Sequence, residues 1–298
     1  MPKQAERASP RPLTTLARQQ LWAGIACLAA AAVVALAQWW LTPRTPADID
    51  RARIEQERRL RAGIWNTTLR LPGTPDLDKL EQRLTEHGVA LGAPVMMRIF
   101  KREFELELWM ARGDGYHLFA TYPICRFSGD LGPKLREGDH QAPEGFYLVD
   151  AKALNPESRW HRSFNLGFPN PVDRAHARTG TFLMVHGGCS SVGCYAMTDG
   201  VIDEIWKIVT AALKAGQPRF QVQVYPFRLT DESLARYEGD PRLPFWRDLK
   251  AGSDLFEASW LPPRVHQCQR RYAFTQAAKL LDGSQPIDQR CTQEVRAE

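Results

Sequence analysis

The sequence predicts an α+β fold that is rich in strands, with one main helix after a cysteine-containing loop. Short apolar runs bounded by turn residues recur from Val95 onward, and each has the length of a strand. Loops rich in Gly and Pro separate these runs. A strong helical pattern lies at 199–215, where apolar residues repeat every three to four positions. The strand patterns cover residues 103–108, 117–122, 145–150, 181–186 and 220–225.

The strand at 103–108 has the clearest alternation. Its apolar residues, at the even positions, are expected to pack in the core. The three glutamates between them, at the odd positions, are expected on the wet face of the strand and not in a catalytic site. Two long loops, at 129–145 and 166–180, are expected to contact a ligand, because long loops in a compact domain often do.

The N-terminal segment has the pattern of a membrane or export signal. Residues 1–20 carry four basic residues against Glu6, which predicts a cytoplasmic N-terminus. Residues 21–41 hold no charge, and a helix of that length at about 1.5 Å per residue would span about 30 Å, the thickness of a bilayer core. The segment is either a transmembrane anchor with Trp39-Trp40 at the interface, or a signal peptide cleaved after Ala35-Leu36-Ala37.

Three further segments divide the chain. Residues 42–94 are predicted to form a stalk and short helices, with a charged, solvated helix at 48–60 and an amphipathic helix at 76–87. Residues 95–228 hold the strand patterns and are predicted to be the main domain. Residues 229–298 are predicted to be a C-terminal extension of irregular chain, whose aromatic residues pack on the main domain.

The composition is that of a globular domain with an ordinary surface. Of the 298 residues, 44% are hydrophobic, which is ample for a core. Lys and Arg number 39 and Asp and Glu 34, so the formal net charge is 39 − 34 = +5. This small excess adds little attraction for an anionic polymer. Basic and aromatic residues do not interleave as they do in nucleic-acid-binding segments, so no nucleic acid partner is expected.

The segment 185–199 concentrates the reactive side chains. It holds one histidine, two cysteines, two serines and three glycines between an apolar run and a helix pattern. Glycines permit a tight turn from strand to helix, because they tolerate positive φ and close backbone approach. Cys194 lies just before a helix expected to begin at Thr198 or Asp199, both good N-caps. Since the pKa of a thiol falls near a helix N-terminus or a histidine, Cys194 is the candidate nucleophile.

His186 and Gly193 complete this candidate site. His186 can return across the glycine loop to act as general base for Cys194. The backbone N–H groups of Gly193 and Cys194 are candidates for binding an oxyanion. Two other interpretations stay open. The cysteine can be purely structural, or His186, Cys189 and Cys194 can bind a metal, although a clear fourth ligand and the paired spacing typical of structural zinc are missing.

Five of the six cysteines follow the N-terminal apolar segment. Cys268 and Cys291 lie in the tail and can pair in an oxidising compartment. Cys189 is either a small buried hydrophobic residue or bridged to Cys125. A bridge between Cys189 and Cys194 would instead remove the nucleophile.

Beyond this loop, further stretches match a known pattern in order. They are Ile99-Phe100-Lys101, Leu118 to Cys125, Ser128 to Lys134, Glu137-Gly138-Asp139, Gln141 to Tyr147, Ser163 to Gly167 and Asp173 to His176, followed by His186-Gly187 and Ser191-Val192-Gly193-Cys194. Together they resemble the YkuD-type L,D-transpeptidases and in particular their YafK-like branch, over roughly residues 95–265. Most of that family has a second histidine before the Gly-Cys pair and a longer gap after the first, whereas Val192 fills that place here and His186 must serve alone.

The resemblance implies a catalytic domain built as a mixed β-sandwich, and a cysteine enzyme of the bacterial cell wall. In such an enzyme Cys194 attacks an amide carbonyl of a diaminopimelate-containing peptidoglycan stem peptide. His186 takes the thiol proton and returns it to the leaving amine, while the carbonyl of Gly187 orients its ring. A thioester forms and an amine or water resolves it, so no metal or cofactor is needed.

The resemblance also suggests substrate contacts and partners. Arg174 and Arg126 are candidates for binding substrate carboxylates, although arginines that brace a loop would give the same sequence. Tyr147, Asn165 and Tyr195 are candidates for lining the groove. The YafK-like branch is associated with cutting the amide between diaminopimelate and the terminal lysine of a murein-bound outer-membrane lipoprotein. That lipoprotein is therefore a candidate partner beside peptidoglycan itself.

For the location of the protein and for its activity, one alternative each stays open. The catalytic domain is expected in the periplasm, anchored to the inner membrane through residues 21–41 or released after signal cleavage. The chain is expected to be an acyltransferase of the L,D-transpeptidase type. The alternative is a membrane-tethered module that binds peptidoglycan without catalysis. A carbapenem distinguishes the two, because carbapenems acylate the cysteine enzymes of this family.

Overall fold

The computed structural model describes residues 15–41, 45–67 and 69–291. The chain divides into two compact units, Met1–Thr45 and Pro46–Glu298, and each is described by itself.

The first unit contains helix α1 (Thr15–Leu41), which covers the segment with the membrane or export pattern. Across the part of the chain that the structure describes, no helix is both long enough and apolar enough to cross a membrane. Most of the predicted cytoplasmic N-terminus, residues 1–14, lies outside the described residues. So do the side chains at 35–41, which include the predicted cleavage site and the two tryptophans.

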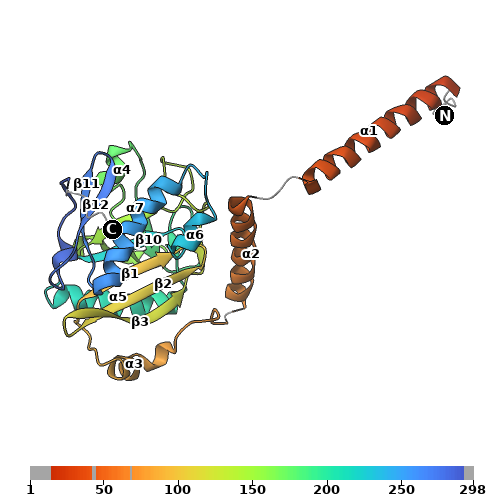
Figure 1. The fold of residues 1–298 in the computed structure, drawn as a ribbon. Coiled ribbons are helices and arrows are strands. Elements are labelled where there is room, and N and C mark those ends of the chain that lie inside the picture. The colour runs from red at the N-terminus through yellow and green to blue at the C-terminus, as the bar shows by residue number, and fades with distance from the viewer. Residues whose placement is uncertain (1–14, 42–44, 68, 292–298) are drawn as a thin grey trace, which may run out of the picture. The chain divides into compact units, whose positions relative to one another are not determined.

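The second unit opens with the helical segments that the sequence predicts. Asp76 caps the first turn of the amphipathic one through a hydrogen bond from the backbone N–H of Asp78. The helical segments are α2 (Pro46–Asn66), η1 (Leu77–Lys79) and α3 (Leu80–Glu86). Figure 1 shows α2 and α3 in the brown and orange colours of the N-terminal part of the chain.

Helix α2 is not a free, solvated stalk. Its charged sequence includes Ile54, which is fully buried in the core. Arg58 Nε donates to the carbonyl of Phe127 at 2.9 Å, and an Arg61 amine donates to the carbonyl of Ile124 at 3.0 Å. The long arginine side chains thus attach this helix to the strand-rich body, which a pattern of charges alone does not reveal.

The larger part of the core is a five-stranded sheet in the order β3-β2-β1-β10-β5. β1 pairs in parallel with β10, and the other pairs are antiparallel. Every residue of β1 and β10 is buried, including Gln221 and Gln223 of β10, whose side chains take part in buried hydrogen bonds. The strands are β1 (Val95–Phe100), β2 (Glu105–Arg112), β3 (Gly115–Pro123), β5 (Gly145–Val149) and β10 (Phe220–Tyr225).

A second sheet has five strands of two to five residues in the order β4-β9-β8-β7-β6. β8 and β9 are parallel and the remaining pairs are antiparallel. Both sheets and the following helix α5 (Asp199–Lys214) contribute to one hydrophobic core, which confirms the predicted α+β, strand-rich class. The strands are β4 (Arg126–Phe127), β6 (Leu154–Ser158), β7 (His161–Asn165), β8 (Met184–His186) and β9 (Tyr195–Ala196).

The C-terminal extension is more regular than the sequence suggests. Helix α7 (Leu243–Ser259) lies against the first sheet, where Phe256 meets Trp109 with ring centroids 5.0 Å apart (Figure 1). Gly252 lets the helix approach closely, because a Cβ there would lie 2.5 Å from the Phe146 ring. Pro and Gly inside this stretch hide the helical pattern. The remaining elements are η2 (Ala151–Ala153), α4 (Pro171–Ala175), α6 (Asp231–Ala235), η3 (Asp282–Ser284), and a small sheet of β12 (Arg271–Thr275), β11 (Arg264–Cys268) and β13 (Asp288–Gln289).

One glutamate of β2 departs from the expected wet face. Glu107 is buried, with Trp109 Nε1 donating to it at 3.0 Å. Arg228 lies 2.8 Å from it and Arg98 3.9 Å. The alternation of the strand is local, whereas these partners come from other segments and provide the compensation that a buried carboxylate requires.

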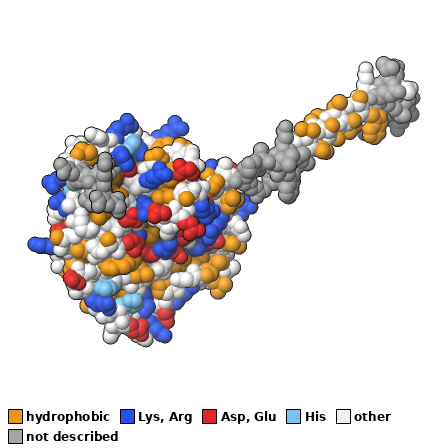
Figure 2. Space-filling model, viewed as in Figure 1, with side chains coloured by type: hydrophobic (Ala, Val, Ile, Leu, Met, Phe, Trp, Pro, Cys, Tyr) orange, Lys and Arg blue, Asp and Glu red, His pale blue; other side chains and the backbone are white. Residues whose placement is uncertain are grey.

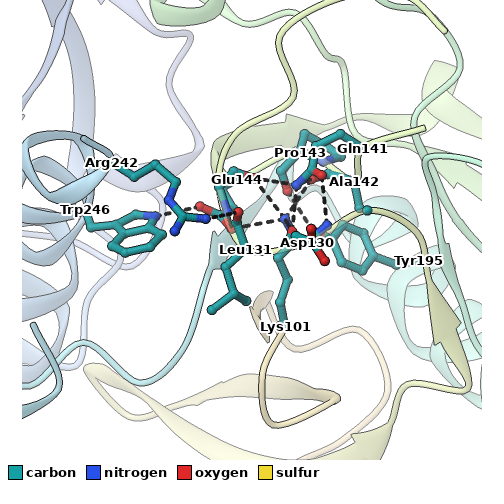
Figure 3. Close-up of polar contacts among 12 residues, drawn as sticks. Lys101, Asp130, Leu131, Gln141, Ala142, Pro143, Glu144, Tyr195, Arg242 and Trp246 are labelled. Carbon is teal, nitrogen blue, oxygen red and sulfur yellow. Dashed lines mark hydrogen bonds and ion pairs between the residues drawn. The ribbon is translucent and has the colours of Figure 1, made fainter. Parts of the chain in front are cut away.

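A buried ion pair fixes the long loop that follows β4. Lys101 Nζ is completely buried and donates to the carbonyls of Asp130, Gly132 and Ala142 at 2.8 to 3.0 Å (Figure 3). It also lies 3.0 Å from Glu144 Oε1. Glu144 in turn accepts hydrogen bonds from the Gly132 N–H and from the Trp246 indole of α7. The loop at 129–145, predicted to contact a ligand, is therefore held by buried hydrogen bonds from Lys101 and Glu144 to its backbone.

Two disulfides cross-link the described chain, Cys125–Cys189 and Cys268–Cys291. The pairing expected in the tail is present. For Cys189 the structure selects the bridge over the buried free thiol. Cys27 and Cys194 remain as free thiols among the described cysteines.

The visible face of the molecule mixes both signs of charge. Figure 2 shows Lys and Arg side chains interspersed with Asp and Glu. This agrees with the small net charge and with an ordinary solvated surface.

Candidate active site

Strand register places the candidate residues on one face of the second sheet. Residues next to each other along a strand point to opposite faces. One row of cross-strand partners is fully buried in the core and consists of Phe164, Val185, Tyr195 and Phe127. The neighbouring row, on the opposite face, consists of Ser163, His186, Ala196 and Arg126. Continuing the register by one residue the other way gives a second row on that face, which consists of Asn165, Met184, Cys194 and Ser128.

Extended by one residue beyond β9, the register of β8 with β9 puts His186 and Cys194 on the same face of adjacent parallel segments. Strands about 4.8 Å apart and a rise of about 3.3 Å per residue put their Cα atoms about 8 Å apart, within reach of an imidazole and a thiol. The N–H of Met184 lies 3.4 Å from Cys194 Sγ, which confirms that Cys194 is level with Met184. The thiol itself donates to the carbonyl oxygen of Phe182 at 3.5 Å, so its printed contacts are with the backbone of the segment that leads into the strand of His186.

Close backbone approach determines the shape of the loop between them. A Cβ on Gly187 would lie 2.7 Å from Asp199 Oδ1, so only glycine fits there. The same oxygen accepts the N–H of Gly188 at 2.8 Å. Cys189 has a φ of 44°, which side-chain-bearing residues rarely adopt, and its disulfide to Cys125 holds it there. The loop is consequently tied both to helix α5 and to the segment before β4.

His186 is buried and has the tautomer that a general base needs. Its Nδ1 lies 2.6 Å from the carbonyl oxygen of Gly187, the group predicted to orient it. A carbonyl only accepts, so Nδ1 carries the proton and Nε2 keeps its lone pair. Burial lowers the pKa of His186 below its usual 6.5, although the Gly187 carbonyl acts in the opposite direction. The Trp160 ring lies over the imidazole with centroids 6.1 Å apart.

Cys194 is a neutral thiol in this environment. Only 8% of the residue is exposed, and burial raises the pKa of the thiol, against smaller lowering effects of the Met184 N–H and the Lys134 charge. Helix α5 does begin at Asp199, as predicted, but β9 separates Cys194 from its first turn. The lowered thiol pKa expected from a helix N-terminus is therefore absent. At rest the Cys194 thiol therefore stays protonated and donates to the carbonyl of Phe182.

The two backbone groups expected to bind an oxyanion are already engaged. The N–H of Gly193 donates to Ser128 Oγ, and the N–H of Cys194 donates to Ser191 Oγ at 3.1 Å. Ser191 Oγ lies 2.7 Å from the carbonyl oxygen of Cys194 and 3.2 Å from Ser128 Oγ. These serine contacts correct the simple expectation of a free oxyanion hole at Gly193.

The five predicted substrate-binding residues lie in three different environments. Arg126 and Asn165 lie on the same sheet face as Cys194. Arg174 is exposed and donates to the carbonyl of Pro169, so it braces its own loop. Tyr147 and Tyr195 are buried, and their hydroxyls donate to the carbonyls of Glu144 and Pro143. Neither tyrosine lines an open groove, because their positions along β5 and β9 point into the core.

Sequence reasoning missed Ser128, Ser191 and Trp160. Ser191 stands three residues before Cys194, and that spacing is a signal for a hydroxyl that caps a turn. Ser128 and Trp160 come from distant segments, and only the strand pairing brings them to the site. The alternative metal site fails, because Cys189 is in a disulfide. Among the described residues there is also no cluster of three or more His, Cys, Asp and Glu that could hold a metal.

Two open cavities flank this part of the molecule, and neither is lined by Cys194 or His186. One of about 880 Å³ lies between α3 and the start of α5. The other, of about 660 Å³, lies beside the clamped loop and includes Leu135, Gln141 and Arg178 in its lining.

Comparison with known proteins identifies the family. No family model matches the chain. It is 49% identical over 182 residues to "Putative L,D-transpeptidase YafK" of Escherichia coli (strain K12), a match that covers 61% of this chain and 74% of that protein. The protein of the same name from Escherichia coli O157:H7 matches to the same extent.

Solved structures give weaker matches. The helical cell shape determining protein Pgp2 from Campylobacter jejuni is 18% identical, with 59% of this chain and 65% of that chain covered and a TM-score of 0.37. Bd1075 from Bdellovibrio bacteriovorus is 17% identical, with 56% and 61% covered and a TM-score of 0.34. On the strength of the 49% identity over 74% of the relative, the chain belongs to the YafK-like branch of the L,D-transpeptidase family.

Proposed function

We propose that the chain is a cysteine-dependent L,D-transpeptidase-family enzyme that acts on diaminopimelate-containing stem peptides of peptidoglycan through a thioester. The main support is the register that puts His186 and Cys194 on one face of neighbouring strands. The name of the Escherichia coli relative supports the reaction class. Arg126 and Asn165, on the same face, are the proposed contacts for the polar groups of the stem peptide.

The reaction begins from the neutral pair. His186 Nε2 takes the thiol proton as Cys194 Sγ attacks the amide carbonyl, so the carbonyl π electrons move onto oxygen. Collapse of this intermediate re-forms the carbonyl and breaks the C–N bond. The imidazolium gives its proton to the leaving amine, and a thioester remains on Cys194. Because Nδ1 is held by Gly187, the ring keeps its orientation through both proton transfers.

The thioester is resolved by an amine, which gives transpeptidation, or by water, which gives hydrolysis. We propose that hydrolysis of the amide that links murein to a bound lipoprotein is one activity of this site. Val192 occupies the place where most of the family has a second histidine, and its side chain is 71% exposed. A short loop with an open rim supports access of water to the thioester.

The test of the nucleophile is acylation by a carbapenem. We expect the full chain to gain one covalent adduct on Cys194, located by peptide mapping. Cys194→Ala should give no adduct and no activity on muropeptides. Ser190→Ala, in the same loop, is the matched control and should keep both. An unmodified wild-type chain would instead favour a peptidoglycan-binding module without catalysis.

The direction of the reaction needs a second substrate. Murein carrying covalently bound lipoprotein is incubated with the protein, and the products are separated by mass. Freed lipoprotein together with an unmodified tripeptide stem would support release. New diaminopimelate–diaminopimelate crosslinks, with the lipoprotein still bound, would overturn hydrolysis in favour of synthesis.

The proposed compartment is the periplasm, where the substrate lies. Two disulfides support it, since such bonds persist in oxidising compartments and are rare in the cytosol.

A further inference from the structure

The occupied N–H groups beside the nucleophile point to an additional catalytic side chain. An oxyanion needs hydrogen-bond donors placed where its charge develops. The Gly193 and Cys194 N–H groups, which stand closest along the chain, already donate to Ser128 and Ser191. A donor for the oxyanion therefore has to come from these hydroxyls, or their hydrogen bonds have to break.

The hydroxyl protons of Ser191 and Ser128 have different acceptors. Ser191 Oγ lies 2.7 Å from the Cys194 carbonyl oxygen, which has no proton to offer, so Ser191 donates its single proton there. The longer contact of 3.2 Å between the two hydroxyls then uses the proton of Ser128. Ser191 is thus fully engaged in holding the turn at Cys194. At 3.2 Å, the contact that uses the Ser128 proton is longer than the other hydrogen bonds of the two serines, and this proton can turn toward a stronger acceptor.

Ser128 is also correctly placed. It follows β4 directly, and its hydroxyl accepts the N–H of Gly193, the residue before Cys194. Extending the register of Phe127 with Tyr195 by one residue puts Ser128 opposite Cys194. Cross-strand neighbours on one face have Cβ atoms about 4.5 to 5.5 Å apart. Its backbone is fixed too, because its carbonyl accepts the N–H of Ala142, whose own carbonyl is bound by buried Lys101.

We propose that Ser128 is a catalytic residue whose hydroxyl donates the hydrogen bond that stabilises the oxyanion formed when Cys194 attacks its substrate. This inference rests on the function proposed above. The Gly193 N–H stays on Ser128 Oγ and polarises it, and a hydroxyl that accepts one hydrogen bond is a stronger donor of the next.

The steps balance as follows. The Cys194 thiol proton moves to His186 Nε2, the Sγ–C bond forms, and the carbonyl electron pair goes to oxygen. The Ser128 O–H turns from Ser191 Oγ to that oxygen, with no proton transferred from the serine. When the carbonyl re-forms, the C–N bond breaks, His186 protonates the amine, and the Ser128 O–H returns to Ser191. Water that later resolves the thioester generates a second oxyanion in the same place.

The experiment compares two reactions of Cys194 in the full chain. Acylation by a carbapenem passes through an oxyanion, whereas alkylation by iodoacetamide is a displacement at carbon that forms none. Peptide mapping separates Cys194 from Cys27, the other free thiol in the described residues. We expect Ser128→Ala to slow acylation about 100-fold, a typical loss for one oxyanion donor, and to leave alkylation within about twofold of wild type.

Two further variants make the result specific. Ser128→Thr keeps a hydroxyl and should restore most of the acylation rate, while Ser190→Ala should match wild type in both reactions. Equal losses of acylation and alkylation in Ser128→Ala would reduce Ser128 to a structural residue, and unchanged acylation would overturn the proposal. A wild-type chain that is alkylated but never acylated would overturn the proposed function, and Ser128 with it.

Discussion

The two five-stranded sheets differ in what holds them together. In the first sheet, β1 and β10 are six residues long and buried throughout, so backbone ladders and apolar packing define their positions. In the second sheet, β8 has three residues and β9 has two. Its geometry depends on a disulfide, on serine hydroxyls and on the Asp199 carboxylate. The first sheet is the scaffold, and the second carries the reactive groups.

This contrast predicts that substitutions separate by region. Changes in the first sheet should mainly alter the free energy of unfolding. Changes in the second sheet should mainly alter the reactions of Cys194.

The largest effect is expected at His186 in the second sheet. His186→Ala removes the general base, so carbapenem acylation should fall about 10³- to 10⁴-fold while the unfolding midpoint changes little. The rate is measured by mass spectrometry and the midpoint by circular dichroism. His161→Ala is the matched control, because His161 pairs with Asp203 at the surface and should keep its acylation rate. Equal rates in the two variants would contradict the assigned role.

The next effect is expected at Lys101, which follows β1 and forms the buried ion pair with Glu144. Lys101→Met strands a buried carboxylate and three carbonyls, so the free energy of unfolding should fall by about 3 to 5 kcal/mol, as measured by denaturant titration. The exposed pair of Lys207 with Glu81 provides the control, and Lys207→Met should cost less than about 1 kcal/mol. If both variants lower the free energy of unfolding equally, the Lys101–Glu144 pair is not a determinant of stability.

A smaller effect is expected from the disulfides. Replacing Cys125 and Cys189 by Ser should lower the free energy of unfolding by about 2 to 4 kcal/mol and also slow acylation, because this bridge holds the nucleophile loop. Replacing Cys268 and Cys291 by Ser opens a shorter loop, which should cost about 1 kcal/mol less, and should leave acylation unchanged. Acylation that is insensitive to both replacements would show that the loop holds its shape without the bridge.

The smallest effect concerns pH. The reaction needs neutral His186, and burial lowers the pKa of His186, so the acylation rate should stay high until the pH falls below 6.5 and then decline. Because burial raises the pKa of Cys194, the rate should not decline between about pH 7 and 9. A profile that is flat down to about pH 4 and falls above about pH 8 would indicate a preformed thiolate–imidazolium pair instead.

The sequence alone determined much of the scaffold and the choice of Cys194 and His186 as the candidate reactive pair. The strand patterns at 145–150 and 220–225 and the helix at 199–215 all appear within one or two residues of their predicted bounds. Each depends on the periodicity of apolar side chains, which is a local property. Cys194 and His186 were found because they share one short loop, and local chain geometry is enough to bring them together.

Only the tertiary structure decided which distant groups surround that pair. Ser128 reaches Gly193 and Ser191 beside Cys194 because β4 pairs with β9, and Tyr195 turns into the core because one residue of register selects the face. Glu107 is buried because arginines from other segments neutralise it. Register and long-range pairing follow from the packing of the whole core, and no local pattern in the sequence specifies them.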